Sequence, residues 1–384
     1  MTVDIRELTR QAAEAAAEHA AETDAAATFP VDALNELRRG GLLGLLVPAE
    51  LGGLGGGLDD LVTTTMELGR ADLSVALIFA MHCQQVATVE RYACPQLREA
   101  VLPAIAAGKV YLGSVTTAPG TGGHLLSSDS AAEQAEDGLL LDRQAPIVTG
   151  GCHADAFLVT MGTPGATSPA QVDLVYATRD QLSIEVLGGW SPLGMRATES
   201  VPMRLRGTVP AEQVIGTAGG FRNIAAAWFA PLAHIGWSAA WLGTAVGAYS
   251  RLLAHVRAPA QRSQFDPGSE LLLCRLAEIR TELETVHALL RHTVATLRTT
   301  SDPTAPPMQL LINALKMTAS QACYRAVDQM VELAGLRHGY LTCSPLRLER
   351  ALRDLRSASL NYANDRLMLS NGALTLLDVG VHLA

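Results

Sequence analysis

The sequence has few charged residues and no excess of basic ones. Of its 384 residues, 17% are charged, and 29 basic side chains stand against 38 acidic ones, which gives a net charge of −9. Non-specific binding to nucleic acid needs a basic footprint, so the composition argues against that function. Soluble domains usually carry about a quarter of charged residues. We therefore expect a partner subunit to cover part of the surface.

The sequence also contains no CxxC pair and no long apolar run, and we expect no signal peptide. The six cysteines include no CxxC pair, the spacing typical of zinc sites. Their scatter predicts free, mostly buried thiols in a reducing cytosol. The polar first residues do not fit a signal peptide, and no unbroken apolar run reaches the roughly 20 residues of a membrane span. We expect a cytoplasmic protein with no metal site and no membrane partner.

Three composition zones follow one another along the chain. Residues 1–110 read as a helical domain, because strong helix formers dominate. Residues 111–218 contain short alternating runs separated by Gly, Pro and Ser, which predicts a small antiparallel β-barrel-like domain. In residues 219–384, apolar side chains recur at three- and four-residue spacing, in segments that suit a four-helix bundle. The predicted fold class is therefore α+β, mostly α.

The expected elements can be placed along these zones. Asp32 is expected to cap a helix that Gly40 and Gly41 end, and residues 163–170 read as a solvent loop. The apolar stretch 224–253 reads as a buried bundle helix. The predicted N-terminal helices are residues 6–27, 33–39, 59 onward, 74–92 and 96–107, the strands 138–141, 156–160, 173–177 and 201–205, and the bundle helices 226–256, 270–299, 308–334 and 346–369.

Short glycine- and proline-containing motifs are spread over nearly the whole chain. They include FP at residues 29–30, VPAELGG at 47–53, TTAPGTGG at 116–123, GMRATES at 194–200 and ERALRD at 349–354. These motifs, in this order, resemble those of the acyl-CoA dehydrogenase superfamily. The resemblance implies an FAD-dependent flavoenzyme with a helical domain, a β domain and a helical bundle.

The resemblance also implies which residues bind the flavin. In the family, the loop that matches residues 116–123 lies along the flavin ring and the pyrophosphate. Backbone N–H groups of glycine-rich turns can approach phosphate oxygens closely. Here the loop departs from the family's TEPGAGSD pattern at its acidic and serine positions. The cofactor-binding residues implied in this loop are Thr116, Thr117, Gly122 and Gly123.

Two further motifs are implied to bind the cofactor. The strand PIVTGG at residues 146–151 is similar to the family's WITNGG, which assigns Ile147, Val148 and Thr149 to the flavin, with a proline in place of the tryptophan. Arg262 and Phe265 resemble a family pair whose arginine binds FAD pyrophosphate across a subunit interface. The planar fork of arginine suits phosphate oxygens. The chain is therefore expected to form a homo-oligomer, a dimer or a tetramer.

The catalytic base of the family's dehydrogenases is missing from both of its usual places. Those enzymes remove the α-proton of an acyl thioester with a glutamate, about ten residues after an Arg-Asp pair. In this sequence that position is Tyr362. The other place is the long first bundle helix, but no acidic residue occurs between Glu212 and Asp266.

Three residues are candidates to replace the glutamate. Asp365 lies about one helical turn past the usual position, and His234 is the titratable group on the long helix. Tyr362 occupies the position itself, although a tyrosine with an ordinary pKa of about 10 is a weak base at neutral pH.

These features leave three functions open. The first is an FAD-dependent oxidoreductase that acts on an acyl or aminoacyl thioester of CoA or a carrier protein, in specialised biosynthesis. The second is a flavin-dependent monooxygenase of the same fold that uses reduced flavin and O2, assisted by histidines among His82, His153, His234 and His338. The third is a non-redox descendant that binds or rearranges an acyl thioester.

Overall fold

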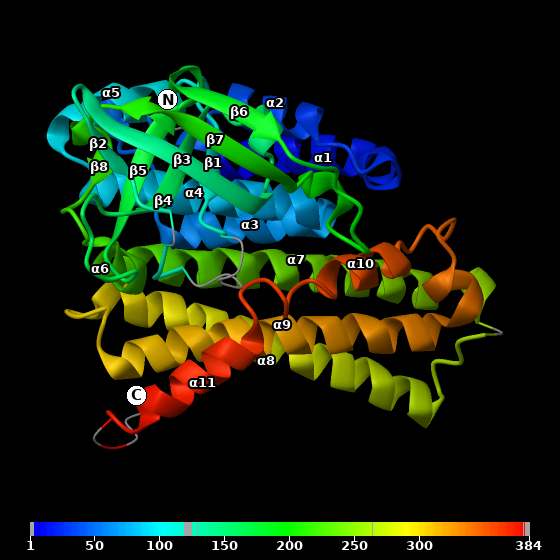
Figure 1. Ribbon diagram of the computed structural model, residues 1–384. Coiled ribbons are helices and arrows are strands. Elements are labelled where there is room, and N and C mark those ends of the chain that lie inside the picture. Colours follow the sequence, from blue (N-terminus) through cyan, green and yellow to red (C-terminus); the bar gives the residue numbers. More distant parts are fainter. Residues whose placement is uncertain (1–3, 119–124, 129, 263, 379, 381–384) are drawn as a thin grey trace. The chain divides into compact units, whose positions relative to one another are not determined.

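The computed structural model describes residues 4–118, 125–128, 130–262, 264–378 and 380. By contact, the chain groups into two compact units whose segments alternate along the sequence. The first unit comprises Met1–Leu61, Ile78–Ser191 and Arg196–Ala233, and the second comprises Val62–Leu77, Pro192–Met195 and His234–Ala384. Figure 1 shows the elements of both units in sequence colours. The three-part division at residues 110 and 218 stays a prediction from composition.

The N-terminal helices confirm the helical prediction for this zone. They are α1 (Ile5–Ala26), α2 (Val31–Arg39), α3 (Leu58–Ala71), α4 (Leu73–Tyr92) and α5 (Pro95–Ala106). Asp4 caps α1, because its side chain accepts the backbone N–H of Arg6. The prediction that Asp32 caps α2 is wrong. Pro30 is the N-cap, and Asp32 lies in the first turn, where its charge favours the positive end of the helix dipole.

Helix α4 is the most apolar helix of this zone. Among the described residues it is the one helix long and apolar enough to cross a membrane by length and composition, and 89% of its most apolar window is buried inside the protein. Core helices of globular proteins show the same combination of length and burial.

The β zone forms two four-stranded sheets, with strand orders β1-β4-β5-β8 and β2-β3-β7-β6. The strands are β1 (Leu112–Val115), β2 (Glu133–Ala135), β3 (Gly138–Val148), β4 (Ala156–Gly162), β5 (Val172–Thr178), β6 (Leu182–Val186), β7 (Val201–Val209) and β8 (Val214–Ile215). The prediction of an antiparallel domain is wrong for one pair, because β1 and β4 run parallel. The long connection between them lets the chain return in the same direction, which a short hairpin cannot do.

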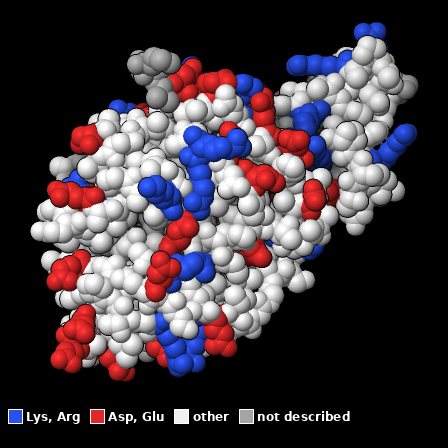
Figure 2. All heavy atoms as spheres, turned by 90° about the horizontal axis from the view of Figure 1, so that it is seen from above, with Lys and Arg blue, Asp and Glu red and all other residues white. Residues whose placement is uncertain are grey.

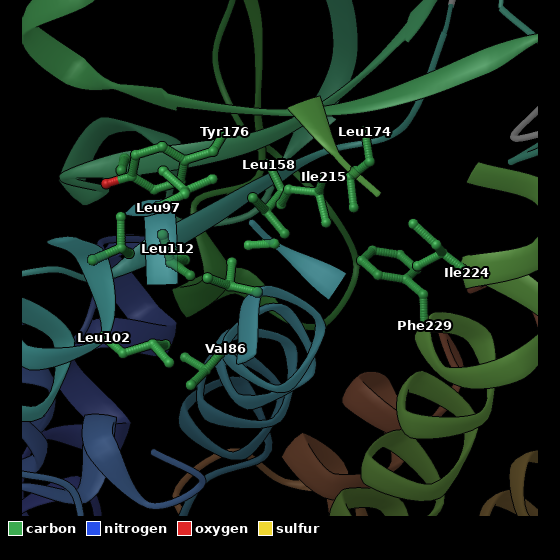
Figure 3. Close-up of a cluster of buried hydrophobic side chains, with 14 of the residues drawn as sticks. Val86, Leu97, Leu102, Leu112, Leu158, Leu174, Tyr176, Ile215, Ile224 and Phe229 are labelled. Carbon is green, nitrogen blue, oxygen red and sulfur yellow. The ribbon is translucent and has the colours of Figure 1, made fainter. Parts of the chain in front are cut away.

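The core of the first unit lies between the first sheet and helices α4 and α5. Val86 and Leu102 of these helices belong to one buried cluster with Leu158 and Leu174 of the sheet, all labelled in Figure 3, and each of the four is 0% exposed. Burial of each such side chain stabilises the fold by about 1.5–3 kcal/mol. Phe229 closes the cluster at the start of the next helical segment. This core holds the first sheet, whose strand β1 leads into the segment with Thr116 and Thr117.

The helices of the second unit confirm most of the bundle prediction. They are α7 (Ala230–Arg257), α8 (Glu270–Thr299), α9 (Pro306–Gly335), α10 (Leu348–Leu355) and α11 (Asn364–Thr375), and α6 (Phe221–Ile224) precedes α7. The single helix predicted at residues 346–369 is wrong, because it is broken between α10 and α11. At the break, Tyr362 has a φ of +52°, a left-handed conformation that no α-helix contains.

Small residues bring α3 and α7 into close contact within the second unit. A Cβ atom on Gly243 would lie 2.1 Å from the carbonyl oxygen of Met66, and one on Gly69 would lie 2.5 Å from that of Ala240. The hydroxyl of Thr244 donates to the carbonyl of Gly69 at 2.9 Å. These glycines are therefore required for packing.

Charged side chains of both signs lie on the surface, and the cysteines are divided between the interior and the surface. Acidic and basic side chains are interspersed on the face shown in Figure 2. The cysteines are free, but the prediction that most of them are buried is wrong. Two are buried, Cys83 and Cys323; one is intermediate, Cys94; and three are exposed, Cys152, Cys274 and Cys343.

Candidate flavin and substrate sites

The first candidate flavin contact is the end of β3, where a bulge interrupts the sheet. The pairing of β3 with β7 shifts register between Ala145 and Val148, which leaves Ile147 outside the ladder and 47% exposed. Thr117 takes over the backbone groups of Ile147: its hydroxyl donates to the carbonyl at 3.0 Å and accepts the N–H at 3.4 Å. Arg143, buried below, donates to the carbonyl of Thr117 at 3.0 Å. An exposed apolar side chain thus lies beside a fixed hydroxyl.

The turn after β3 contains the second group of predicted residues. Val148 is buried in the strand, so its side chain supports the site from behind. Thr149 is half-buried, and its hydroxyl lies 3.0 Å from that of Ser200. Gly150 has a φ of +59°, and a Cβ atom there would lie 2.6 Å from the ring of Phe29. Only glycine fits this turn, so the position of Thr149 is fixed by backbone geometry.

These described residues fit a flavin. A flavin ring has an apolar face and a hydrogen-bonding edge, and exposed Ile147 with the hydroxyls of Thr117 and Thr149 offers both. Thr116, half-buried, leads out of β1 toward the same loop. The predicted Gly122 and Gly123 lie outside the described residues.

The predicted pair Arg262 and Phe265 divides into an exposed and a buried member. Arg262 ends a short 3₁₀ turn, is exposed, and forms no ion pair with any described carboxylate. Its guanidinium is therefore available to an anion such as a phosphate. Phe265 is 4% exposed and packs edge-on against the ring of His255, at 5.9 Å between centroids. As placed, Phe265 anchors the loop that carries Arg262.

The second unit brings together two of the predicted catalytic residues, His234 and Tyr362. Their ring centroids lie 6.1 Å apart. Burial, together with the charge of Lys316, lowers the pKa of His234 to about 3, so the imidazole is neutral at pH 7. Burial raises the pKa of Tyr362, which keeps its proton. Neither group is a ready proton acceptor at neutral pH.

Asp365, the third predicted residue, lies three residues after Tyr362, at the start of α11. It occupies the first turn of α11, and its side chain is exposed. The ring pair of His234 and Tyr362 is instead influenced by cations, Lys316 for the histidine and Arg366 for the tyrosine.

Lys316 is a site residue that the sequence did not reveal. It is 0% exposed on α9, and its ammonium donates to the carbonyls of Ala358 and Tyr362 at 3.1 and 2.9 Å and to the side chain of Asn364 at 2.8 Å. The three bonds hold the break between α10 and α11. The lysine therefore stabilises the segment in which Tyr362 leaves the helical conformation. A lone charge on a helix face that is otherwise apolar was the available signal.

The histidines considered as helpers have different roles in the structure. His82 is fully buried, with Nε2 bonded to the carbonyl of Leu43 at 2.9 Å and Nδ1 accepting the N–H of Leu112 at 3.1 Å. It is a satisfied core histidine, and burial lowers its pKa to about 4. His153 pairs with Glu199 at 2.8 Å.

The remaining histidine, His338, lies in a turn of π-helix (Leu336–Tyr340) that follows α9. Its ring centroid is 4.4 Å from that of His255, on α7 of the same unit. The neighbouring ring and partial burial lower the pKa of His255, with burial the larger cause. This pair supports the loop that carries Phe265, since His255 also packs on that ring.

Comparison with known proteins defines the class of this chain. Residues 2–109 match the family "Acyl-CoA dehydrogenase, N-terminal domain", and residues 220–361 match "Acyl-CoA dehydrogenase, C-terminal domain". The chain belongs to the acyl-CoA dehydrogenase superfamily. Its fold agrees with the predicted helical, sheet and helical order, and the membership supports the predicted flavin cofactor.

Particular relatives carry out different reactions. The mitochondrial isobutyryl-CoA dehydrogenase of Dictyostelium discoideum is 26% identical over 349 residues, 88% of this chain and 80% of that protein. Dibenzothiophene monooxygenase of Mycolicibacterium goodii is 24% identical over 365 residues, 88% of this chain and 86% of that protein. The structure of FMN-bound TdsC from Paenibacillus sp. A11-2 covers 97% of both chains with a TM-score of 0.86 and 21% identity.

Proposed function

We propose that this chain is a flavin-dependent monooxygenase that uses reduced flavin and O2. The observation that carries the proposal is the pair at the position of the family's base. Tyr362 occupies that position with a raised pKa, beside a neutral His234. The charged residues that shift the pKa values of this pair are cations, Lys316 for His234 and Arg366 for Tyr362. Removal of an α-proton needs an accepting base, and oxygen transfer from a reduced flavin does not. The monooxygenase relative, matched over 86% of its length, also supports this choice.

The residues of the chain would divide the work between them. When bound, the flavin supplies the electrons that activate O2. Thr117, Ile147 and Thr149 would hold the ring, and Arg262 would bind the pyrophosphate of a flavin held by another copy of the chain if that flavin is FAD. Tyr362 keeps its proton and would donate a hydrogen bond to the substrate instead of accepting a proton.

A second candidate is oxidation of an acyl or aminoacyl thioester of CoA or a carrier protein, in specialised biosynthesis. The observation in its favour is Asp365, an exposed carboxylate three residues past Tyr362, together with the isobutyryl-CoA dehydrogenase relative. In this case Asp365 would be the base. For both candidates we propose a cytoplasmic homo-oligomer, a dimer or a tetramer.

Two assays separate the candidates. The first mixes the oxidised, flavin-loaded protein anaerobically with isobutyryl-CoA and longer acyl-CoA thioesters while the flavin absorbance is followed. We expect no bleaching. Bleaching that Asp365→Asn abolishes would establish the dehydrogenase and overturn the monooxygenase.

The second assay supplies NADH, a separate flavin reductase and FMN or FAD under air, with 4-hydroxybenzyl alcohol, indole and dibenzothiophene as probe substrates. We expect an oxygenated product that depends on both reductase and O2, and an unchanged rate in Asp365→Asn. A protein that takes up neither flavin contradicts both candidates and leaves the non-redox descendant.

A further inference from the structure

Three polar groups on one face of α7 are buried without a hydrogen-bond partner. They are Nδ1 of His234, Oγ of Ser238 and Nε1 of Trp241, and their residues are 3%, 0% and 0% exposed. None of these atoms has a partner among the described residues. Because the residues are four and three positions apart, they lie above one another on the helix. We call His234, Ser238 and Trp241 the polar stripe.

The polar stripe belongs to the same cluster as the predicted catalytic position. The ring of His234 lies 6.1 Å from Tyr362 and 5.9 Å from Trp237, and Trp237 lies 6.3 Å from Trp241. The ammonium of Lys316 lies 5.6 Å from the ring of Trp241 and 2.9 Å from the carbonyl of Tyr362. These contacts, all within the second unit, place the stripe opposite α9 and beside the break that holds Tyr362.

Unsatisfied groups of this kind are rare and unfavourable. Large surveys find that about 90% or more of buried polar groups have a partner, and each one left without costs about 1–3 kcal/mol. Three such atoms in a row on one helix face therefore indicate that something polar completes them.

The hydrogen-bonding character of the stripe defines what that partner must offer. The ring of His234 also bonds the backbone of Ile312, and this bond favours a proton on that side of the ring. Neutral His234 therefore presents Nδ1 as an acceptor, Ser238 can donate or accept, and Trp241 donates only. The ligand must supply a donor near His234 and an acceptor near Trp241. A hydroxyl group is both.

The ligand is also neutral. A buried anion would need a cation with a free donor, and the cation against Trp241, Lys316, already donates to Ala358, Tyr362 and Asn364. The residues of the stripe span seven positions, about 10 Å of helix, which is too far for one hydroxyl to bridge.

We propose that the polar stripe is a specificity site that recognises a neutral substrate portion carrying two or more oxygen functions, at least one of them a hydroxyl. The inference rests on the proposed function in that the occupant is the molecule to be oxidised. A plain hydrocarbon chain would leave all three groups of the stripe unpaired.

The test measures binding without turnover. The protein is produced with 5-fluorotryptophan in place of tryptophan and is used as purified. Its four ¹⁹F signals correspond to the four tryptophans of the chain. Trp241→Phe assigns the reporter signal. The probes are 4-hydroxybenzyl alcohol and 4-methylanisole, which have the same number of heavy atoms but differ in hydroxyl groups, and glycerol serves as a small polyol of another shape.

We expect 4-hydroxybenzyl alcohol to shift the Trp241 signal saturably and 4-methylanisole to do so much more weakly. Ser238→Ala should weaken binding of the diol about fivefold, the loss of one hydrogen bond, and leave 4-methylanisole unchanged. Trp190→Phe is the control, because Trp190 lies in the β zone of the first unit. This variant should still bind 4-hydroxybenzyl alcohol more tightly than 4-methylanisole. The other ¹⁹F signals report whether Ser238→Ala remains folded.

Several results would overturn the proposal. The first is equal binding of the two aromatic probes, and the second is a preference for the diol that survives Ser238→Ala. The third is no shift of the Trp241 signal by any of the three probes up to about 100 mM. This range covers the weak Kd values of small fragments. The last result would mean that ordered water alone completes the stripe. Because no flavin reduction or O2 is involved, a failed oxygenation assay with a preserved hydroxyl preference would refute the proposed reaction and not the site.

Discussion

Lys316 allows a quantitative test of the site architecture. Burial lowers its pKa from the usual 10.5 to about 7, while the three oxygen acceptors around the ammonium oppose this effect. A pKa difference of this size between the folded and unfolded states corresponds to about 5 kcal/mol, which is an upper bound because the acceptors favour the charged form.

The sign of the pH dependence follows from proton binding. Between pH 7 and 10.5 the unfolded chain keeps a proton on this lysine that the folded chain releases. The contribution of Lys316 to the unfolding free energy is therefore fully present above pH 10.5. It is lost as the pH falls toward 7, by up to about 1.4 kcal/mol per pH unit. Lys316→Met removes the titrating group and the donors to Ala358 and Tyr362. We expect the difference in unfolding free energy between wild type and variant to widen as pH rises.

The assay is urea unfolding followed by circular dichroism from pH 7 to pH 10. Lysine is rare in this chain, and the only other one is Lys109, which is exposed. Lys109→Met is therefore a matched control that should keep the wild-type pH dependence. For the same reason, ¹³C-lysine labelling gives two resolvable Cε signals, and Lys109→Arg assigns them. A Lys316 signal that titrates at 10.5 or above, or parallel stability curves for Lys316→Met and wild type, would refute the reasoning.

Three other perturbations test separate parts of the structure. His82 and His234 are buried neutral with pKa values near 4 and 3, so stability should fall as pH drops from 6.5 toward 3, and His82→Gln should flatten part of this loss in acid unfolding curves. Gly150→Ala should lower the unfolding free energy by at least about 1–3 kcal/mol in urea and weaken flavin binding, because its Cβ meets Phe29; normal flavin retention would contradict the assigned turn. Arg262→Gln should weaken FAD binding at least about tenfold while FMN, which lacks the pyrophosphate, binds unchanged in fluorescence titrations.

Much of the fold could be predicted because its signals are local. The termini of α4 and α8 lie within a residue of the segments expected for them, and the strands β4 and β5 contain the alternating runs that predicted them. The parallel direction of β1 and β4 could not be predicted, since the partners are far apart in sequence and a strand pattern carries no direction.

The site was harder to predict because its geometry depends on long-range contacts. Tyrosine has no preference for positive φ, so nothing local marks Tyr362 as the point where a helix breaks. The break is held by Lys316, 46 residues earlier, whose bond to the carbonyl of Tyr362 is visible only in three dimensions. The motifs singled out Thr117 and Thr149 as candidate flavin residues, but they gave no sign of the bulge that exposes Ile147.

The close contact of α3 with α7 has a consequence for how the chain folds during synthesis. Gly243 packs on Met66 inside one unit, although two of the three segments of the first unit lie between them in the sequence. The ribosome releases Val62–Leu77 early, but the helices against which this segment packs emerge only after residue 234. Domains usually fold as units while the chain grows. Here an apolar segment must wait unpaired, and a fragment of the bundle made without it would expose the glycine face of α7.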